Sequence, residues 1–385
     1  MRPAKRYSLA AAAGDNVLSM RVLIAPDKFK GSLGAFEVAA AIAAGVRSAQ
    51  PGVEIEIVAL ADGGEGTADA ICRARPAEWV VCAAHDALGN PIEPAFVWVA
   101  AERLAIMEMS AAAGLAQLAP NERDPVRAST YGVGEMLRAA ADHGAQKIII
   151  GLGGSATNDG GFGMACALGF HFRAGDGAEI SGPVSGLIEL AAINSPNDPF
   201  APRLVAACDV RNPLLGPEGA TSVFSAQKGA DAGQRELLER CLTRLADVAA
   251  QTFARDHREH PGAGAAGGLG FGLLTFCNAV IRSGFEVVAE AVALEEKIAR
   301  AEIVITGEGK LDRQTLAGKA PAGVAQMARR AGKRVFAIVG QASNDSEVRE
   351  LFEQVITLDD TSVGYRDTPR LLESKAQALA ESWSR

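Results

Sequence analysis

Short apolar runs alternate with amphipathic stretches at both ends of the chain. Runs typical of buried strands occupy residues 22–25, 55–60, 303–306, 335–339 and 355–358. Apolar residues at helical spacing predict helices at about residues 35–49, 320–330 and 369–382. Five strands with intervening helices predict a small doubly wound parallel sheet.

The middle of the chain has a different order of strands and helices. Three short strands are expected at residues 79–84, 95–100 and 104–109, joined by turn-rich links, which is typical of an antiparallel meander. Beyond them we expect helices at 131–143, 162–168 and 234–253, and strands at 147–150 and 204–208. The chain is long enough for two domains.

We therefore predict fold class α/β with two domains. Residues 21–61 and 285–385 form the doubly wound parallel sheet, and residues 62–284 form a mixed α/β domain inserted into it. Residues 1–20 are expected to be a disordered tail or to precede the true start of the protein. The two chain crossings, near residues 61 and 285, predict a cleft between the domains, which is a common place for ligands.

The most informative segment is GLGGSATNDGG, at residues 151–161, directly after the expected strand 147–150. Gly153 and Gly154 would let the backbone approach a ligand closely. Ser155, Asn158 and Asp159 add a hydroxyl, an amide and a carboxylate. The helix expected next would point its N-terminus at the same space, which favours an anion. The alternative is a glycine-rich turn in which one polar residue caps that helix.

Four other strand ends repeat this pattern. The loops after them read PDKFKGS (26–32), ADGGEGT (61–67), DVRNP (209–213) and TGEGKLD (306–312). In open α/β sheets ligands bind beyond the carboxyl ends of the strands. Any one loop is compatible with a surface turn, but five together predict a crowded, charged site.

The composition argues against some classes of binding partner. The formal net charge is −8 and no basic stripe stands out, which argues against a nucleic-acid partner. The six cysteines form no CxxC pair, so we expect reduced thiols in a cytoplasmic protein. No apolar run reaches the length of a membrane span, so no membrane partner is expected.

Familiar catalytic motifs are missing or out of context. The stretch GAGAAG at 262–267 matches GxGxxG, but no strand precedes it, so a dinucleotide site is rejected. GxxxxGK[ST], GxSxG and HExxH do not occur. The remaining inventory of glycines, carboxylates and lysines suits phosphoryl transfer, in which a protein mainly positions groups and neutralises charge, and in which Mg²⁺ takes oxygen ligands.

These considerations assign roles to particular residues. Asp209 ends a buried strand and is the expected base, although it could also cap the turn at 211–213. The expected catalytic residues are Asp209, Asp62 and Lys30. The expected substrate- or phosphate-binding residues are Gly63, Gly64, Gly153, Gly154, Ser155, Asn158, Asp159, Lys310 and Lys319. The expected metal ligands are Glu308 and Asp312. For each single lysine or acid, the alternative is a solvated surface charge.

The motifs also resemble those of a known family. The matching segments are IAPDKFKGSL (24–33), ADGGEGT (61–67), GGSATNDGG (153–161), ACDV with NP (207–213), QKGA (227–230), GAAGG (264–268) and TGEGKLD with GK (306–319). In order and spacing they resemble the bacterial glycerate kinase family, of the glycerate 2-kinase type. The resemblance covers the chain from about residue 21 onward.

The resemblance implies a fold and an activity. It implies a flavodoxin-like domain and the phosphorylation of D-glycerate to 2-phosphoglycerate, with ATP and Mg²⁺ as cofactors. Two alternatives remain open at this point. One is transfer to the 3-hydroxyl, because the two hydroxyls are neighbours. The other is a non-catalytic glycerate-binding sensor, against which all the acid and lysine loops are intact.

Overall fold

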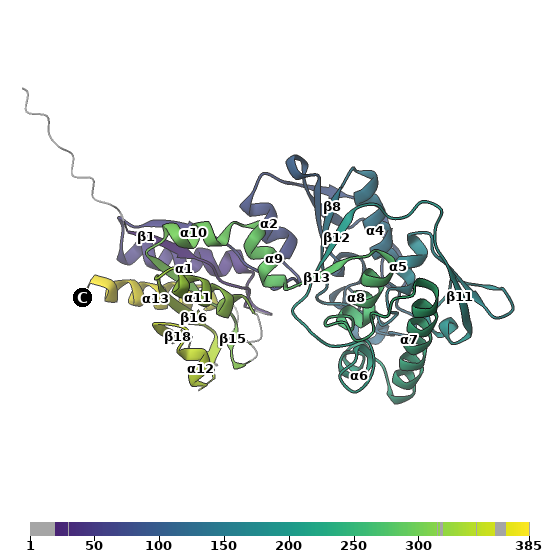
Figure 1. Ribbon diagram of the computed structural model, residues 1–385. Helices are drawn as coiled ribbons and strands as arrows, with labels where there is room; N and C mark the ends of the chain where they lie inside the picture. Colours follow the sequence, from purple (N-terminus) through teal and green to yellow (C-terminus); the bar gives the residue numbers. More distant parts are fainter. Residues whose placement is uncertain are drawn as a thin grey trace, which may run out of the picture.

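The structure is a computed structural model that describes residues 20–29, 31–313, 315, 319–343, 345–358 and 367–384. Two large sheets organise these residues, each covered by helices, and they lie beside one another along the long axis of the molecule (Figure 1). The α/β class expected from the sequence is confirmed.

The first sheet has five strands, all parallel. In spatial order they are β2 (Glu54–Ile57), β1 (Arg21–Ile24), β14 (Ile303–Thr306), β16 (Arg334–Val339) and β18 (Gln354–Thr357). Counted along the chain this is the order 2-1-3-4-5 of flavodoxin-like folds. The parallel sheet expected from both ends of the chain is therefore confirmed.

Helices cover both faces of the first sheet. One face packs against α1 (Ala35–Ala49) and α13 (Thr368–Glu381), through a cluster that includes Ile24 and Ile305. The other face packs against α10 (Leu294–Arg300) and α11 (Ala320–Arg330). Burial on both faces explains why these strands read as continuous apolar runs.

The second sheet has six strands. In spatial order they are β3 (Glu78–Val81), β6 (Ala95–Val99), β7 (Leu104–Glu108), β8 (Lys147–Gly151), β12 (Arg203–Ala207) and β13 (Val280–Arg282). The first three are antiparallel neighbours, as the predicted meander requires, and the remaining pairs are parallel. The helices that share its core are α4 (Tyr131–Asp142), α5 (Phe162–Ala167), α7 (Ala232–Phe253) and α8 (Ala265–Phe276).

Several elements were not foreseen from the sequence. They include α2 (Thr67–Ala74), α9 (Gly284–Ala291) and a small sheet of β10 (Glu179–Ile180), β9 (His171–Ala174) and β11 (Leu190–Asn194). Shorter elements are α3 (Ser110–Ala113), α6 (Ala220–Phe224), α12 (Ser346–Arg349), β4 (Ala84–His85), β5 (Pro91–Ile92), β15 (Lys310–Leu311) and β17 (Gln341–Ala342). Each is too short for its periodicity to stand out.

One hydrophobic cluster connects the two sheets. It contains Leu23 and Val304 of the first sheet and Val97 and Ile106 of the second, with residues of α2 and α9. Figure 1 shows α2 and α9 between the sheets. The strands of the first sheet lie outside residues 62–284 and those of the second lie inside them. The division into two domains at residues 61 and 285 remains a prediction, because the sheets share this cluster.

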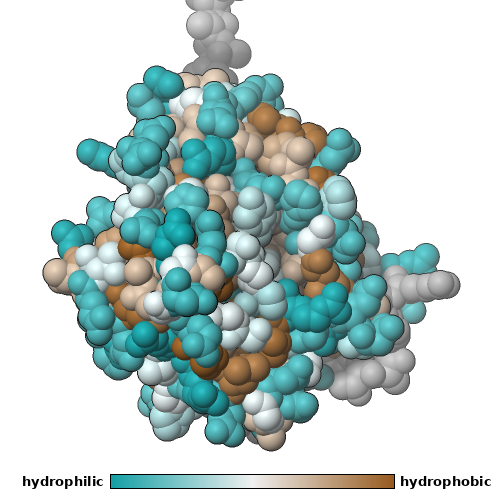
Figure 2. Space-filling view, turned by 90° about the vertical axis from the view of Figure 1, so that its right-hand side faces the viewer, coloured by the Kyte–Doolittle hydropathy of each residue, from teal (hydrophilic) through white to brown (hydrophobic). Residues whose placement is uncertain are grey.

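The described part of the chain contains no helix long and apolar enough to cross a bilayer. Figure 2 shows the end of the molecule formed by the second sheet and its helices. Hydrophilic residues dominate that face, and hydrophobic ones form only small, separate areas (Figure 2).

Candidate functional site

Loops from the carboxyl ends of both sheets meet at one place. A Cβ added to Gly63 would lie 2.9 Å from the carbonyl oxygen of Ala207 and 2.8 Å from Cα of Gly284. A Cβ added to Gly153 would lie 2.5 Å from Cα of Gly64. The loop after β2 therefore touches the loops after β8, β12 and β13 through bare backbone. This contact brings Asp62, Gly63, Gly64, Gly153 and Asp209 together.

Asp209 is held by one oxygen only. Its Oδ1 accepts hydrogen bonds from Ser283 Oγ at 2.9 Å and from the backbone N–H of Gly284 at 2.8 Å. Its Oδ2 is buried and has no partner. Burial raises the pKa of Asp209 to about 6, and the nearby charge of Asp62 adds to the rise. The result is a fixed carboxylate with one oxygen free for another group.

Asp27, Asp62 and Asp209 form a cluster of acids, in which the charge of Asp62 acts on the other two. Asp27 was not among the expected site residues. It is buried, and its Oδ1 accepts a 2.7 Å hydrogen bond from the backbone N–H of Lys28. Burial, followed by the charge of Asp62, raises the pKa of Asp27 to about 7, and Glu308 contributes in the same direction. The signal was present in the sequence, because Asp27 follows a buried strand just as Asp209 does.

The loop after β14 carries acids that are already paired with the expected lysines. Glu308 is buried, accepts a 2.7 Å hydrogen bond from Thr315 Oγ1, and lies 3.6 Å from Lys319 Nζ. Burial raises the pKa of Glu308. Asp312 lies 3.3 Å from Lys310 Nζ. A metal ion that binds these acids, or a phosphate that binds these lysines, would therefore replace the present partner in an ion pair.

A metal ion would find few protein ligands here. Within the described ranges, no group of three or more His, Cys, Asp or Glu side chains is arranged to hold one. Mg²⁺ is commonly bound through one or two carboxylates together with substrate phosphates and water. The pair Glu308 and Asp312 fits that requirement. Lys30, the third expected catalytic residue, lies outside the described residues.

The glycine-rich loop 151–161 divides into two parts. Gly153 contacts the loop after β2, whereas Asn158 and Asp159 lie inside the protein. Asp159 accepts four hydrogen bonds: Oδ2 from the backbone N–H and Oγ1 of Thr130 and from the N–H of Gly163, and Oδ1 from the N–H of Gly161. It thereby fixes the start of α5 and joins it to α4. Ligand contact by these two residues remains a prediction.

Asn158 also has an interior partner. Its Nδ2 donates a 3.1 Å hydrogen bond to Thr221 Oγ1, while its Oδ1 is buried without a partner.

A buried lysine donates hydrogen bonds to the same loop. Lys228 is 1 % exposed, and its Nζ donates to Ser155 Oγ at 2.8 Å and to the carbonyl oxygen of Thr157 at 2.6 Å. Burial lowers the pKa of Lys228 to about 7. Lys228 was not among the expected site residues, although it lies in the QKGA segment at 227–230.

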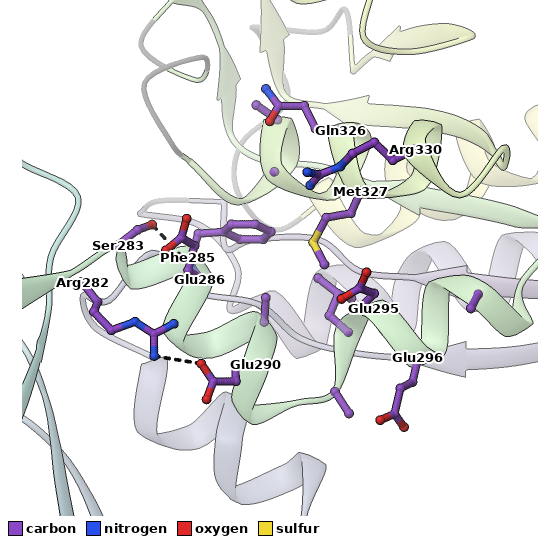
Figure 3. A pocket seen from close by; sticks show the side chains of 16 residues that line it. Arg282, Ser283, Phe285, Glu286, Glu290, Glu295, Glu296, Gln326, Met327 and Arg330 are labelled. Atoms are coloured by element: carbon purple, nitrogen blue, oxygen red, sulfur yellow. Dashed lines mark hydrogen bonds and ion pairs between the residues drawn. The ribbon is translucent and has the colours of Figure 1, made fainter.

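Ser283, which holds Asp209, also lines a groove. It has a volume of about 740 Å³ and lies between α9, α10 and α11. Figure 3 shows Phe285 and Met327 on its floor and Glu290, paired with Arg282, and Arg330 around it. Its size is in the range that small-molecule ligands occupy. Ser283 thus stands between the acid cluster and a space that could take part of a ligand.

Comparison with known proteins identifies the family. The profile described as the glycerate kinase family matches residues 22–384. The glycerate kinase of Bacillus subtilis is 43 % identical over 330 residues, which cover 85 % of this chain and 86 % of that protein. The glycerate 2-kinase of Escherichia coli is 41 % identical over 333 residues, covering 85 % and 86 %.

A solved structure agrees with these sequence matches. The crystal structure of a putative glycerate kinase 2 from Salmonella typhimurium superimposes with a TM-score of 0.84 at 40 % identity, covering 95 % of this chain and 98 % of that one. The match extends over both sheets and the loops between them. The protein is therefore an enzyme that belongs to the glycerate kinase family.

Proposed function

We propose that the protein transfers the γ-phosphoryl group of ATP to D-glycerate and forms 2-phosphoglycerate and ADP. The observation that carries this proposal is Asp209, a buried carboxylate fixed through one oxygen with its other oxygen unpartnered. The glycerate 2-kinase of E. coli, at 41 % identity, favours the 2-hydroxyl as the acceptor over the 3-hydroxyl.

Asp209 is the proposed base. The acceptor hydroxyl loses its proton as it attacks the phosphorus, and a carboxylate within hydrogen-bond reach can take that proton. With its pKa at about 6, Asp209 is mostly ionised at pH 7 yet basic enough to accept the proton. Ser283 and Gly284 keep Oδ1 occupied, so the proton goes to Oδ2.

The remaining loops are proposed to hold the charged parts of the substrates. Glu308 and Asp312 would hold Mg²⁺, which supplies positive charge to the phosphate oxygens. Lys310 and Lys319 would offset phosphate charge, as would Lys30. Gly63, Gly64, Gly153 and Gly154 would let phosphate or glycerate approach the backbone, and Asp62 would lie beside Asp209 in the same site.

The protein is also proposed to work in the cytoplasm. All six cysteines are free thiols, which suits a reducing compartment. This proposal is checked by fractionating cells of the source organism and locating the protein with an antibody.

The decisive experiment identifies the product. Purified protein is incubated with D-glycerate, ATP and Mg²⁺, and the product is examined by ³¹P and ¹H NMR. We expect 2-phosphoglycerate. Formation of 3-phosphoglycerate would overturn the choice of hydroxyl. Binding of glycerate without any turnover of ATP would overturn catalysis and leave the sensor alternative.

A further inference from the structure

Lys228 is a buried cation that the proposed reaction has not used. It follows α6 in a short turn at residues 226–228 and reaches under the loop that leaves β8. Lysine is rarely buried to this degree, because the charged form loses its hydration. Among the described residues its hydrogen-bond partners are Ser155 and Thr157, and Asp159 is the acid whose charge acts on it.

One partner of Lys228, Ser155, adjoins the part of the loop that contacts the loop after β2. Ser155 follows Gly154, which has a φ of 74°, and Gly153, whose backbone lies against Gly64. Ser155 is buried with 8 % of its surface still exposed. When Lys228 Nζ donates to Ser155 Oγ, the hydroxyl hydrogen of Ser155 must point elsewhere. Ser155 is then a donor to any anion that reaches the loop.

We propose that Lys228 is a positioning residue for an anionic group of the substrates. Its ammonium group fixes the turn at residues 153–155 through its hydrogen bonds to Ser155 and Thr157. It also directs the Ser155 hydroxyl toward the ligand and places a positive charge on the interior side of the loop. The anion is either the carboxylate of glycerate or a phosphate of ATP, which share this chemistry. The inference rests on the proposed function, since it assumes that these anions are the substrates.

The protonation state of Lys228 gives this arrangement a pH dependence. Because burial lowers the pKa of Lys228 to about 7, the ammonium form is lost as the pH rises through 7. The negative charge of Asp159 opposes that loss. A neutral amine can accept the Ser155 hydrogen, which turns the donor away from the ligand. We therefore expect anion affinity to fall as the pH rises above 7.

The test compares Lys228→Met with the wild type. Methionine has a similar length, but it leaves the Thr157 carbonyl oxygen and the Asp159 carboxylate without the ammonium group, so the stability of the variant is measured beside its kinetics. We expect KM for D-glycerate or for ATP to rise at least about tenfold, as for the loss of one charge-assisted hydrogen bond, and the fall in affinity above pH 7 to disappear. The substrate whose KM rises identifies the anion. Lys147→Met, at the opposite end of β8, is the matched control and should leave both constants unchanged.

Other outcomes would overturn the inference. One is a folded Lys228→Met protein with wild-type constants and an unchanged pH profile. If Lys228→Met does not fold, Ser155→Ala decides. We expect it to raise KM for one of the two substrates and to abolish the pH dependence, and wild-type values of both constants with an unchanged pH profile would overturn the inference. Binding of inorganic phosphate and of D-glycerate, measured by calorimetry, separates this inference from the proposed function. Weaker binding to Lys228→Met supports the inference even if the wild type turns over no ATP.

Discussion

Asp209 and Asp159 were both expected in the site, yet their carboxylates have different surroundings. Asp209 has two hydrogen bonds on one oxygen and none on the other. Asp159 has donors on both oxygens, four in all. A carboxylate with a free oxygen can take up a proton, whereas a saturated one holds structure together. The two residues should therefore respond differently to the same substitution.

Asp209→Asn should lower kcat by at least about 10²-fold, because the amide keeps the shape but cannot accept the proton. In the wild type, the raised pKa of Asp209, about 6, means that kcat/KM should fall as the pH drops through 6, where the carboxylate becomes protonated. Asp209→Asn should lack this acidic limb. Steady-state kinetics between pH 5 and 8 provide the check.

Asp27→Asn is the control variant for Asp209→Asn, since it removes another buried acid of the cluster and leaves the proposed base in place. If Asp209→Asn keeps near-normal kcat, Asp209 is not the base.

Asp159→Asn should act on stability. The substitution replaces one acceptor oxygen by an NH2 group, so at least one of the four donors loses its acceptor, at a cost of about 1–3 kcal/mol. Urea unfolding should show this loss, while kcat of the folded enzyme stays close to wild type. Unchanged stability with a raised KM would instead show that Asp159 contacts a ligand.

At the scale of single elements, the loops after β2 and β8 depend on the absence of side chains. Gly153→Ala would place Cβ 2.5 Å from Cα of Gly64, so one loop must move. We expect kcat/KM to fall at least about tenfold, because small displacements of catalytic groups are costly. Gly52→Ala is the matched control, since its Cβ would meet nothing within 4 Å. Equal activity of the two variants would show that the contact does not matter.

The elements and the site differ in how far the sequence could define them. All strands of the first sheet, the strands of the second sheet other than β13, and helices such as α1 and α7 were predictable, because their apolar residues form continuous runs or follow one clear period. Helix α9 was missed, although its first residues hold Asp209. Likewise Lys228 was missed, and the four hydrogen bonds of the expected site residue Asp159 were not foreseen, because burial and hydrogen-bond partners are set by contacts between distant segments. Position after a strand predicted Asp209, but nothing local distinguished Asp159 from it.

At the scale of the whole molecule, the shared hydrophobic cluster should make the two sheets unfold together. Phe285 of α9 illustrates the connection, because its ring lies where a Cβ on Gly323 of α11 would be 2.1 Å away. We expect one calorimetric transition for the wild type. Phe285→Ala should lower stability by about 3–5 kcal/mol. Val280→Ala, at an exposed position, should change it little. Two independent wild-type transitions would contradict this expectation.

The order of strands in the first sheet also governs how the protein can fold. The neighbouring strands β1 and β14 pair Val22 with Ile303, so about three quarters of the chain must be synthesised between them. Contacts of such long sequence separation form slowly. While the ribosome makes the second sheet, β1 and β2 lack β14 and expose an apolar edge that favours aggregation. Recovery of active protein should therefore depend on chaperones and on slow synthesis.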